Sequence, residues 1–331
     1  KPVQFYGRLW FKFRQPKVDA LVESPCLRQR NSQWQAPVAH KPTMLGPRRF
    51  EFLSVQHELP AQGGWNDAAL EKLWLYNLHY FEDLNAQGAH RRTAWHVALL
   101  QRWVAENPPS SGNGWEPYPT SLRIVNWVKW ALAGNTLPAG CGQSLVTQAR
   151  WLCKRLEGHL LGNHLFANAK ALVFAGMYFE GPEAGQWLAK GLDILERELP
   201  EQVLPDGGNF ERSPMYHAIF LEDVLDLLNI AGAYTNQVPR TLVVHWRDAA
   251  FRLSEWLQGM THPDEHIALF NDAAFGIAAT ADELAAYAGR VLGTNAVLSG
   301  LPRHSAPCND GGYLCLRQWA DSGYLRLECA D

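Results

Sequence analysis

Hydrophobic residues recur at helical spacing from about residue 65 to about residue 293. Apolar positions three or four residues apart form one face of a helix, and Gly, Pro and Asn residues separate them into blocks. We therefore expect about nine helices with short connections, which make sequential helices antiparallel neighbours. The blocks cover Leu70 to Leu84, Trp95 to Trp103, Leu122 to Leu132 and Leu145 to Leu160, and further ones start near Asn163, Ala184, Ser213, Arg240 and Ala281.

Many of these predicted helices are apolar around much of their circumference, so each is expected to pack on more than one side. Repeated helical hairpins of this kind close into a bundle, a solenoid or an (α/α) toroid. The sequence has no exact repeat of roughly 30–45 residues, which counts against an ordinary solenoid. The pattern therefore predicts a mainly α fold.

The two ends of the chain have a different pattern. The first 64 residues are irregular and rich in proline, and short aromatic runs at Tyr6 to Phe13 and at Phe50 to Leu53 are candidate strands or packing segments. Near the other end, Tyr313 to Trp319 and Tyr324 to Cys329 have strand composition, and Ala320 to Gly323 predict a hairpin turn.

A lone hairpin is not a stable domain, so we expect the second pattern to be the start of a larger β domain that is truncated in this sequence. The predicted organisation has three parts: an irregular N-terminal wrap over residues 1–64, a helical domain over residues 65–300 and the start of a β domain over residues 301–331.

Composition excludes some classes of protein. Of the 331 residues, 47% are hydrophobic and the net charge is −3, so neither a disordered chain nor a basic nucleic-acid-binding surface is expected. No stretch approaches the roughly 20 apolar residues of a membrane span. The six cysteines lack metal-ligand spacing, so we expect buried free thiols, no metal and no cofactor.

The segment from Asp206 to His217 carries the first candidate chemistry. Ser213 followed by Pro214 is typical of a helix start, which places Tyr216 in the first turn. The positive end of the helix dipole and the neighbouring Arg212 favour a phenolate, so we expect the pKa of Tyr216 to be lowered. Tyr216 is therefore a candidate acid/base, and the alternative is a packing residue.

A second candidate segment begins at Asn163 and His164. Asn163 can cap the helix that starts there, and His164 then lies in its first turn. Helix starts attract carboxylates through free N–H groups and the dipole. The pair could hold a substrate carboxylate, and the alternative is an N-cap beside an ordinary surface histidine.

Further polar side chains lie among aromatic residues, in a pattern that lines a sugar-binding cleft or, alternatively, closes an inner layer of helices. Three regions contain them: residues 74–81, residues 115–127, and the surroundings of the 206–217 segment together with the polar loop at residues 270–274. The candidate substrate-binding residues are His79, Tyr80, Tyr118, Arg123, Glu211, Arg212, His217 and Asn271.

Four segments, taken in order, resemble the heparinase II/III-like family of polysaccharide lyases: Trp74 to Phe81, Pro117 to Trp127, Asn163 to Leu172 and Asp206 to His217. The last is the most specific, and the resemblance covers roughly residues 65–331. It implies an (α/α) toroid followed by an antiparallel β-sandwich domain. The expected architecture is thus an incomplete toroid followed by the start of a β-sandwich.

The resemblance also implies β-elimination of an acidic, uronate-containing polysaccharide. Asn163 and His164 then neutralise the uronate carboxylate, and Tyr216 moves protons. A further His or Tyr comes from the β domain in related lyases, and nothing in residues 301–331 matches it. The resemblance implies a periplasmic or secreted protein, although the first residues lack the pattern of a signal peptide.

Two other functions stay open from the residues themselves. A glycoside hydrolase needs two carboxylates across a cleft, for which Glu211 with Glu116 or Asp272 are candidates. A non-catalytic polysaccharide-binding protein is the other alternative, since an aromatic cleft persists when activity is lost.

Overall fold

The computed structural model describes Pro16 and residues 25–160, 163–262, 264–293, 313–319, 321 and 324–330. Within these residues the protein is mostly helical, with nine α-helices that begin close to the expected positions. Three short 3-10 helices, η1 (Glu82–Asn85), η2 (Ala89–Arg92) and η3 (Asn113–Trp115), lie between them. The α-helices are α2 (Lys72–Tyr80), α3 (Thr93–Glu106), α4 (Pro117–Leu132), α5 (Cys141–Lys154), α6 (Asn163–Tyr178), α7 (Pro182–Gln202), α8 (Pro214–Ala233), α9 (Arg240–Gly259) and α10 (Ala281–Leu292).

The helices belong to two compact units. The first comprises Lys1–Arg30 and Ala39–Leu195, and the second comprises Asn31–Val38 and Glu196–Asp331. The division falls inside α7, within the stretch that the sequence predicted as one helical domain.

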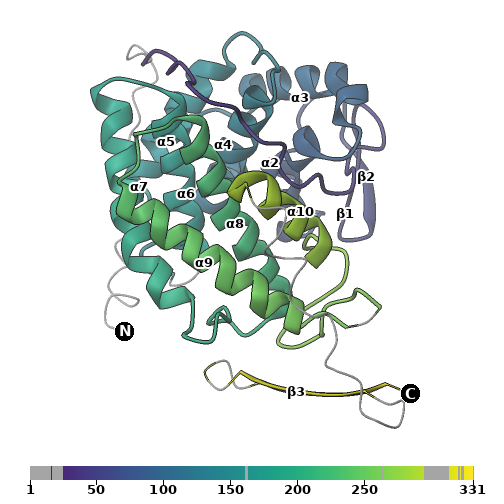
Figure 1. Ribbon diagram of the computed structural model, residues 1–331. Helices are drawn as coiled ribbons and strands as arrows, with labels where there is room; N and C mark the ends of the chain where they lie inside the picture. The colour runs from purple at the N-terminus through teal and green to yellow at the C-terminus, as the bar shows by residue number, and fades with distance from the viewer. Residues whose placement is uncertain are drawn as a thin grey trace. The chain divides into compact units, whose positions relative to one another are not determined.

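Helix α4 is central to the packing of the first unit. It contacts α2, α5 and α6, and α5 also packs against α3 and α6 (Figure 1). Its residue Trp127 is fully buried beside Trp103 of α3, with ring centroids 5.7 Å apart. Helix α6 lies very close to α7, because a Cβ atom at Gly176 would be 2.6 Å from the backbone nitrogen of Leu188.

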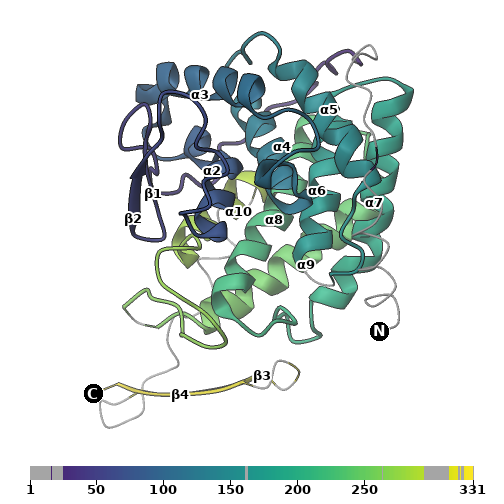
Figure 2. The same cartoon turned by 180° about the vertical axis from the view of Figure 1, so that it is seen from behind.

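A small hairpin joins this unit. Strands β1 (Arg49–Phe52) and β2 (Val55–Glu58) pair antiparallel, and β1 lies against α2 (Figure 2). The two turn residues, Leu53 and Ser54, both have positive φ, as a tight two-residue hairpin turn requires. Of the two interpretations of the aromatic run at Phe50, the strand is therefore correct as far as Phe52, whereas the run from Tyr6 to Phe13 lies outside the described residues.

In the second unit, α8, α9 and α10 pack against one another. A buried hydrogen-bond network joins two of them: the Tyr287 hydroxyl of α10 donates to Asp226 of α8 at 2.9 Å and accepts from Asn229 at 2.9 Å. Asn229 also donates to the backbone oxygen of Gln35. These bonds attach the 31–38 segment to the helices.

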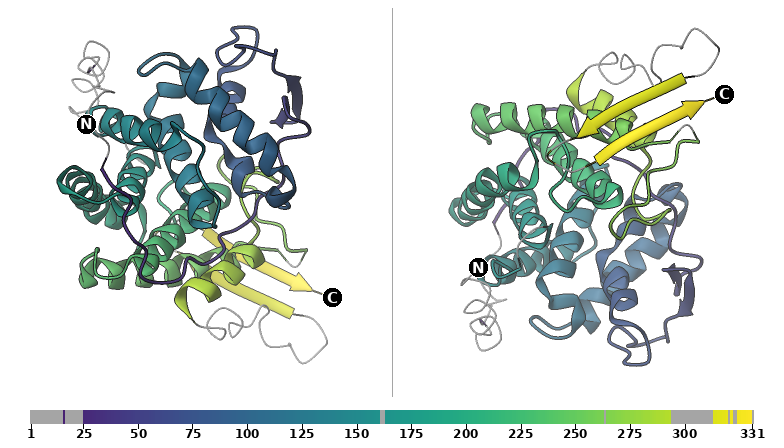
Figure 3. Two further views of the ribbon diagram at one scale, coloured as in Figure 1. Left: turned by 90° about the horizontal axis from the view of Figure 1, so that it is seen from above. Right: turned by 90° about the horizontal axis from the view of Figure 1, so that it is seen from below.

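The two predicted C-terminal strands are confirmed as a pair, whereas the predicted turn between them lies, except for Asp321, outside the described residues. Strands β3 (Tyr313–Trp319) and β4 (Tyr324–Ala330) pair antiparallel, with Trp319 opposite Tyr324 (Figure 3). Among the described cysteine side chains, all of which are free, Cys141 is buried and Cys153 is partly exposed. Cys26 is exposed, so the expectation of a buried thiol is wrong there.

Two searches of the described residues had negative results. None of the described helices combines the length and hydropathy that crossing a membrane requires. No group of three or more His, Cys, Asp or Glu residues there is placed to hold a metal ion.

Candidate active site

The first part of the candidate site is the start of α6. Asn163 is the first residue of this helix and His164 lies in its first turn, as the sequence predicted. Both are partly exposed, whereas every residue from Phe166 onward in this helix is buried. The apolar body of α6 thus fixes its first turn at the edge of the core.

The imidazole of His164 is held on two sides. Its Nδ1 atom lies 3.3 Å from Oε2 of Glu157, and its ring packs on Tyr118 of α4 with centroids 4.5 Å apart. Tyr118 in turn meets Tyr80 of α2 edge-on at 6.0 Å. The structure therefore brings together three residues that the sequence selected from separate segments, His164, Tyr118 and Tyr80.

Glu157 was not identified from the sequence. Its backbone N–H donates to Oδ1 of Asn168 at 2.8 Å, and Nδ2 of Asn168 donates back to its Oε2 at 3.3 Å. Asn168 also donates to Oγ of Ser121 on α4 at 3.0 Å. The apolar spacing placed Glu157 inside the predicted helix from Leu145 to Leu160, but α5 ends at Lys154 and Glu157 lies in the connection to α6.

A second carboxylate lies among the tyrosines of this unit. The Tyr76 hydroxyl donates to Glu116, which also pairs with Lys72 at 2.9 Å. Burial, followed by the hydrogen bond and charge of Glu116, raises the pKa of Tyr76 well above its usual range. Burial, followed by the neighbouring Tyr118, raises the pKa of Tyr80 likewise. Both phenols are therefore protonated hydrogen-bond donors at neutral pH.

Two predicted substrate-binding residues of this unit are instead part of its core. His79 is fully buried: Nε2 bonds the backbone oxygen of Trp65 at 3.0 Å, and Nδ1 accepts from the Trp103 indole at 3.0 Å. Burial, assisted by the charge of Arg123, lowers the pKa of His79 to about 3. Neither ring nitrogen is therefore free to bond a substrate, which contradicts the prediction that His79 binds it.

Arg123 is fully buried as well. Its guanidinium lies 3.9 Å from the ring centroid of Trp103 and donates to Oε1 of Gln148 at 3.0 Å. The interpretation of Arg123 as a residue that lines a cleft is therefore corrected: its buried guanidinium joins α4 to α3 and α5.

The start of α8, in the second unit, is a separate candidate region. Ser213 is the N-cap and Pro214 the first helical residue, so Tyr216 lies in the first turn, as predicted. The Ser213 hydroxyl accepts from the Tyr216 backbone N–H at 3.5 Å. Tyr216 is partly exposed while its neighbours Met215 and His217 are buried.

His217 is fully buried and holds this segment in place through hydrogen bonds to the backbone. Its Nδ1 accepts from the backbone N–H of Asn209 at 3.1 Å, its Nε2 bonds the backbone oxygen of Leu253 at 2.8 Å, and its ring stacks on Trp256 at 4.3 Å. Burial lowers its pKa to about 4. The prediction that His217 binds substrate directly is corrected to a structural role.

Three other predicted residues lie at the surface of this unit. Asn271 donates from Nδ2 to the backbone oxygen of Arg212 at 2.8 Å. Arg212 is exposed with a positive φ of 57° and also donates to the backbone oxygen of Asp321 at 3.5 Å. Glu211 is partly exposed beside it. Glu211 and Arg212 thus lie three and two residues before Pro214, where α8 begins, and Asn271 is bonded to Arg212 from a distant loop.

The known proteins that are similar to this chain are heparinases and heparin-sulfate lyases. The family model described as Heparinase II/III N-terminus matches residues 84–289. A heparin-sulfate lyase from Bacteroides stercoris is 35% identical over 115 residues, which are 34% of this chain and 17% of that protein. One from Bacteroides thetaiotaomicron is 29% identical over 196 residues, 54% of this chain and 28% of that protein.

Solved structures share the fold. A heparinase III structure matches with a TM-score of 0.59 at 18% identity, and the match covers 96% of this chain and 55% of that structure. The structure of a heparan sulfate lyase from Pedobacter heparinus matches with a TM-score of 0.56 at 19% identity. This match covers 95% of this chain and 54% of that structure. The chain therefore spans about half the length of these structures, and less of the curated relatives. Because the family model matches more than half of its residues, the chain belongs to the heparinase II/III family, in the N-terminal region of that family.

Proposed function

We propose that this protein is a polysaccharide lyase that cleaves a uronate-containing polysaccharide of the heparan sulfate class by β-elimination. The observation that carries the proposal is the pair of partly exposed helix starts, Asn163 and His164 on α6 and Tyr216 on α8. The names of the curated relatives, heparin-sulfate lyases, support the substrate class.

The chemistry requires a stabilised carbanion. The C5 proton of a uronate is weakly acidic because it is α to the carboxylate. A base removes this proton, the bond from C4 to the glycosidic oxygen breaks, the oxygen takes up a proton, and a C4–C5 double bond forms. Hydrogen-bond donors that neutralise the carboxylate stabilise the enolate-like intermediate.

The residues divide these tasks by their chemistry. The Asn163 amide and the His164 imidazole are donors at a helix start, where the dipole and free N–H groups also favour an anion. Tyr216 is the proton carrier, taking the proton from C5 or giving one to the glycosidic oxygen. Tyr118, Glu211, Arg212 and Asn271 are proposed to contact flanking sugars.

This mechanism requires Asn163, His164 and Tyr216 to act on the same sugar unit. For the fold we propose an incomplete (α/α) toroid followed by the start of an antiparallel β-sandwich. The helix order and the β3–β4 hairpin support it, as do the folds of the structures that match. Side chains more than about 15 Å apart would be too far for one sugar unit to bridge.

The test is a screen of heparan sulfate and other uronate polymers with the full-length protein. A lyase releases a product with a conjugated double bond, which absorbs ultraviolet light. New reducing ends without this absorbance would indicate a glycoside hydrolase. Binding without any product would indicate a polysaccharide-binding module, and either result would overturn the proposal.

A further inference from the structure

The surroundings of His164 contain a buried carboxylate to which the proposed mechanism gives no task. Glu157 is only 6% exposed, and burying a carboxylate is costly unless charged or polar partners compensate. Its Oε2 atom lies 3.3 Å from Nδ1 of His164. A buried acid that faces a partly exposed histidine is the arrangement by which proteins orient a functional imidazole.

Glu157 is itself fixed by a chain of hydrogen bonds. Asn168, which is fully buried, accepts from the Glu157 backbone and donates to its carboxylate. The same amide donates to Ser121, whose hydroxyl donates to the backbone oxygen of Pro117 at 2.8 Å. The carboxylate of Glu157 is thus connected by hydrogen bonds to α4 as well as to α6. The two side chains that make this connection, Asn168 and Ser121, are both buried.

The second ring nitrogen of His164, Nε2, is not bonded by Glu157. Glu157 occupies Nδ1, and Tyr118 covers one face of the ring. Among the described residues no protein atom bonds Nε2, and the side chain is 35% exposed. A carboxylate on Nδ1 requires the proton there, so Nε2 is the atom that faces outward, to donate when the ring is charged.

We propose that Glu157 is a positioning residue: it accepts from the Nδ1–H of His164, so that the doubly protonated ring presents Nε2–H beside Asn163 toward the uronate carboxylate. This inference rests on the proposed function, since it assigns a role around the same helix start. It adds a residue from the α5–α6 connection to the site. The alternative is that Glu157 only ties this connection to Asn168.

The first experiment needs no activity. The protein, labelled with ¹⁵N in its 12 histidines, is studied by NMR at a pH where the rings are neutral, and His164→Ala identifies the His164 signals. We expect the neutral ring to carry its proton on Nδ1 in the wild type. In Glu157→Gln we expect a shift toward the Nε2–H tautomer, which free imidazole side chains favour. An Nε2–H tautomer in the wild type would overturn the proposal even if the variant did not fold.

The second experiment is a double-mutant cycle on heparan sulfate cleavage by the full-length protein. Glu157→Gln should lower kcat/KM about 10–100-fold, as substitutions of residues that orient a functional histidine do. In the His164→Ala background the same change should have almost no further effect, because the two residues act as one unit. Equal losses in both backgrounds would show that Glu157 acts only on the fold.

A matched carboxylate controls for stability. Glu106 accepts from the Trp65 indole at 2.6 Å and the Gly63 backbone at 3.0 Å in the same unit, and it makes no contact with His164. Glu106→Gln should leave the His164 tautomer unchanged, and a change there would contradict a specific role of Glu157. If the wild type has the Nδ1–H tautomer but cleaves no uronate polymer, the proposed function fails and the orientation of His164 by Glu157 stands.

Discussion

Asn271 donates a hydrogen bond from Nδ2 to the backbone carbonyl oxygen of Arg212, at 2.8 Å, although 59 positions separate them in the sequence. Both residues have positive φ, 47° and 57° respectively, which is uncommon for side chains other than glycine. The bond therefore fixes two unusual backbone turns against each other just before α8, the helix that carries Tyr216.

Asn271→Ala should loosen this connection. The variant removes the donor but leaves the fold of α8 intact, since Ser213 and Pro214 start that helix independently. We expect a loss of stability of about 1 kcal/mol and a higher KM for polysaccharide with a smaller effect on kcat. Urea unfolding and steady-state kinetics measure the two effects. An unchanged KM would show that this loop does not contribute to the binding surface.

Tyr216→Phe should nearly abolish turnover in the full-length protein and leave polysaccharide binding almost intact. The change removes only the hydroxyl, so the shape of the first turn of α8 is kept while the proton carrier is lost. Loss of general acid/base catalysis costs about 10²–10⁴-fold. Product absorbance measures the rate and calorimetry measures binding. Near-normal elimination by this variant would make the tyrosine structural.

His164→Ala should weaken both binding and rate, because the imidazole is proposed to touch the carboxylate in the ground state and in the transition state. The kinetic signature is a higher KM together with a lower kcat, which distinguishes it from Tyr216→Phe. His90→Ala removes an exposed imidazole of the same unit and is the control. A loss in kcat alone would assign His164 a role only in the transition state.

Stability should fall as pH is lowered from about 6.5 to about 4. Burial lowers the pKa of His217 to about 4, below its value of about 6.5 in the unfolded chain. Between these values the unfolded state binds more protons, so acid favours unfolding, by up to about 1.4 kcal/mol per pH unit for one histidine. His79, whose pKa is lowered to about 3, adds to the same trend.

Chemical unfolding at several pH values tests this for His217. His217→Gln should reduce the slope of unfolding free energy against pH in this range, whereas His245→Gln, at an exposed position, should not. An equal slope in wild type and His217→Gln would contradict the assignment of His217 as a buried neutral ring.

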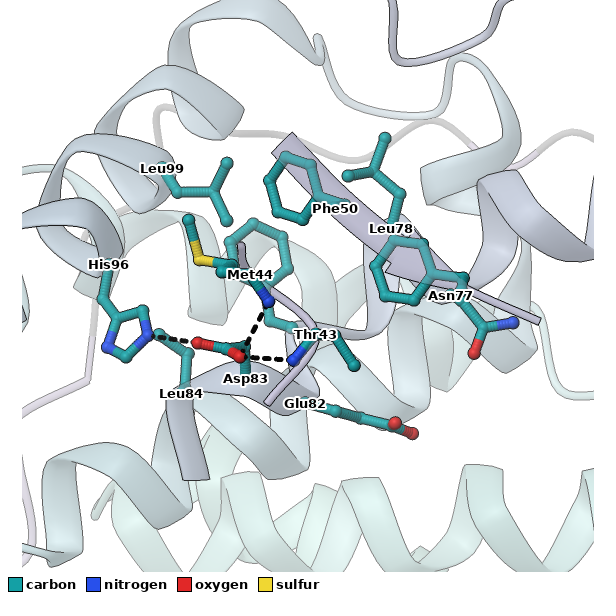
Figure 4. A pocket seen from close by; sticks show the side chains of 12 residues that line it. Thr43, Met44, Phe50, Asn77, Leu78, Glu82, Asp83, Leu84, His96 and Leu99 are labelled. Atoms are coloured by element: carbon teal, nitrogen blue, oxygen red, sulfur yellow. Dashed lines mark hydrogen bonds and ion pairs between the residues drawn. The ribbon is translucent and has the colours of Figure 1, made fainter. Parts of the chain in front are cut away.

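Asp83 should contribute stability that acid removes. Oδ1 accepts from the backbone N–H groups of Thr43 and Met44, and Oδ2 accepts from His96 (Figure 4). Oδ2 also accepts from Nε of Arg92 at 2.7 Å. Burial alone would raise the pKa of Asp83, but the hydrogen bonds from these groups outweigh it and hold the pKa below its usual value.

Because the folded-state pKa is lowered, this contribution is complete above about pH 3.9 and is lost as pH falls through the folded value. Asp83→Asn should therefore destabilise the protein by about 3 kcal/mol at pH 7, and the difference from wild type should shrink below about pH 4. Asp67→Asn, at an exposed turn, should change stability by less than about 0.5 kcal/mol. A difference that stays constant down to pH 3 would contradict the role of the Asp83 charge.

The sequence by itself determined the helices and their starts. Ser213 and Pro214 fix the start of α8 through local capping chemistry, and apolar spacing fixes the number of helices, because both depend on residues a few positions apart. The alternation from Tyr313 onward likewise specified the β3–β4 pairing.

Only the tertiary structure decided which polar residues are buried and which face outward. His79, Arg123 and His217 resemble site residues in the sequence but have their polar groups bonded inside the core. Glu157 was predicted to lie within a helix, yet it lies in a connection against His164. The physical reason is that burial and these hydrogen bonds depend on how helices and connections pack in three dimensions, whereas periodicity and capping record only positions along a single helix.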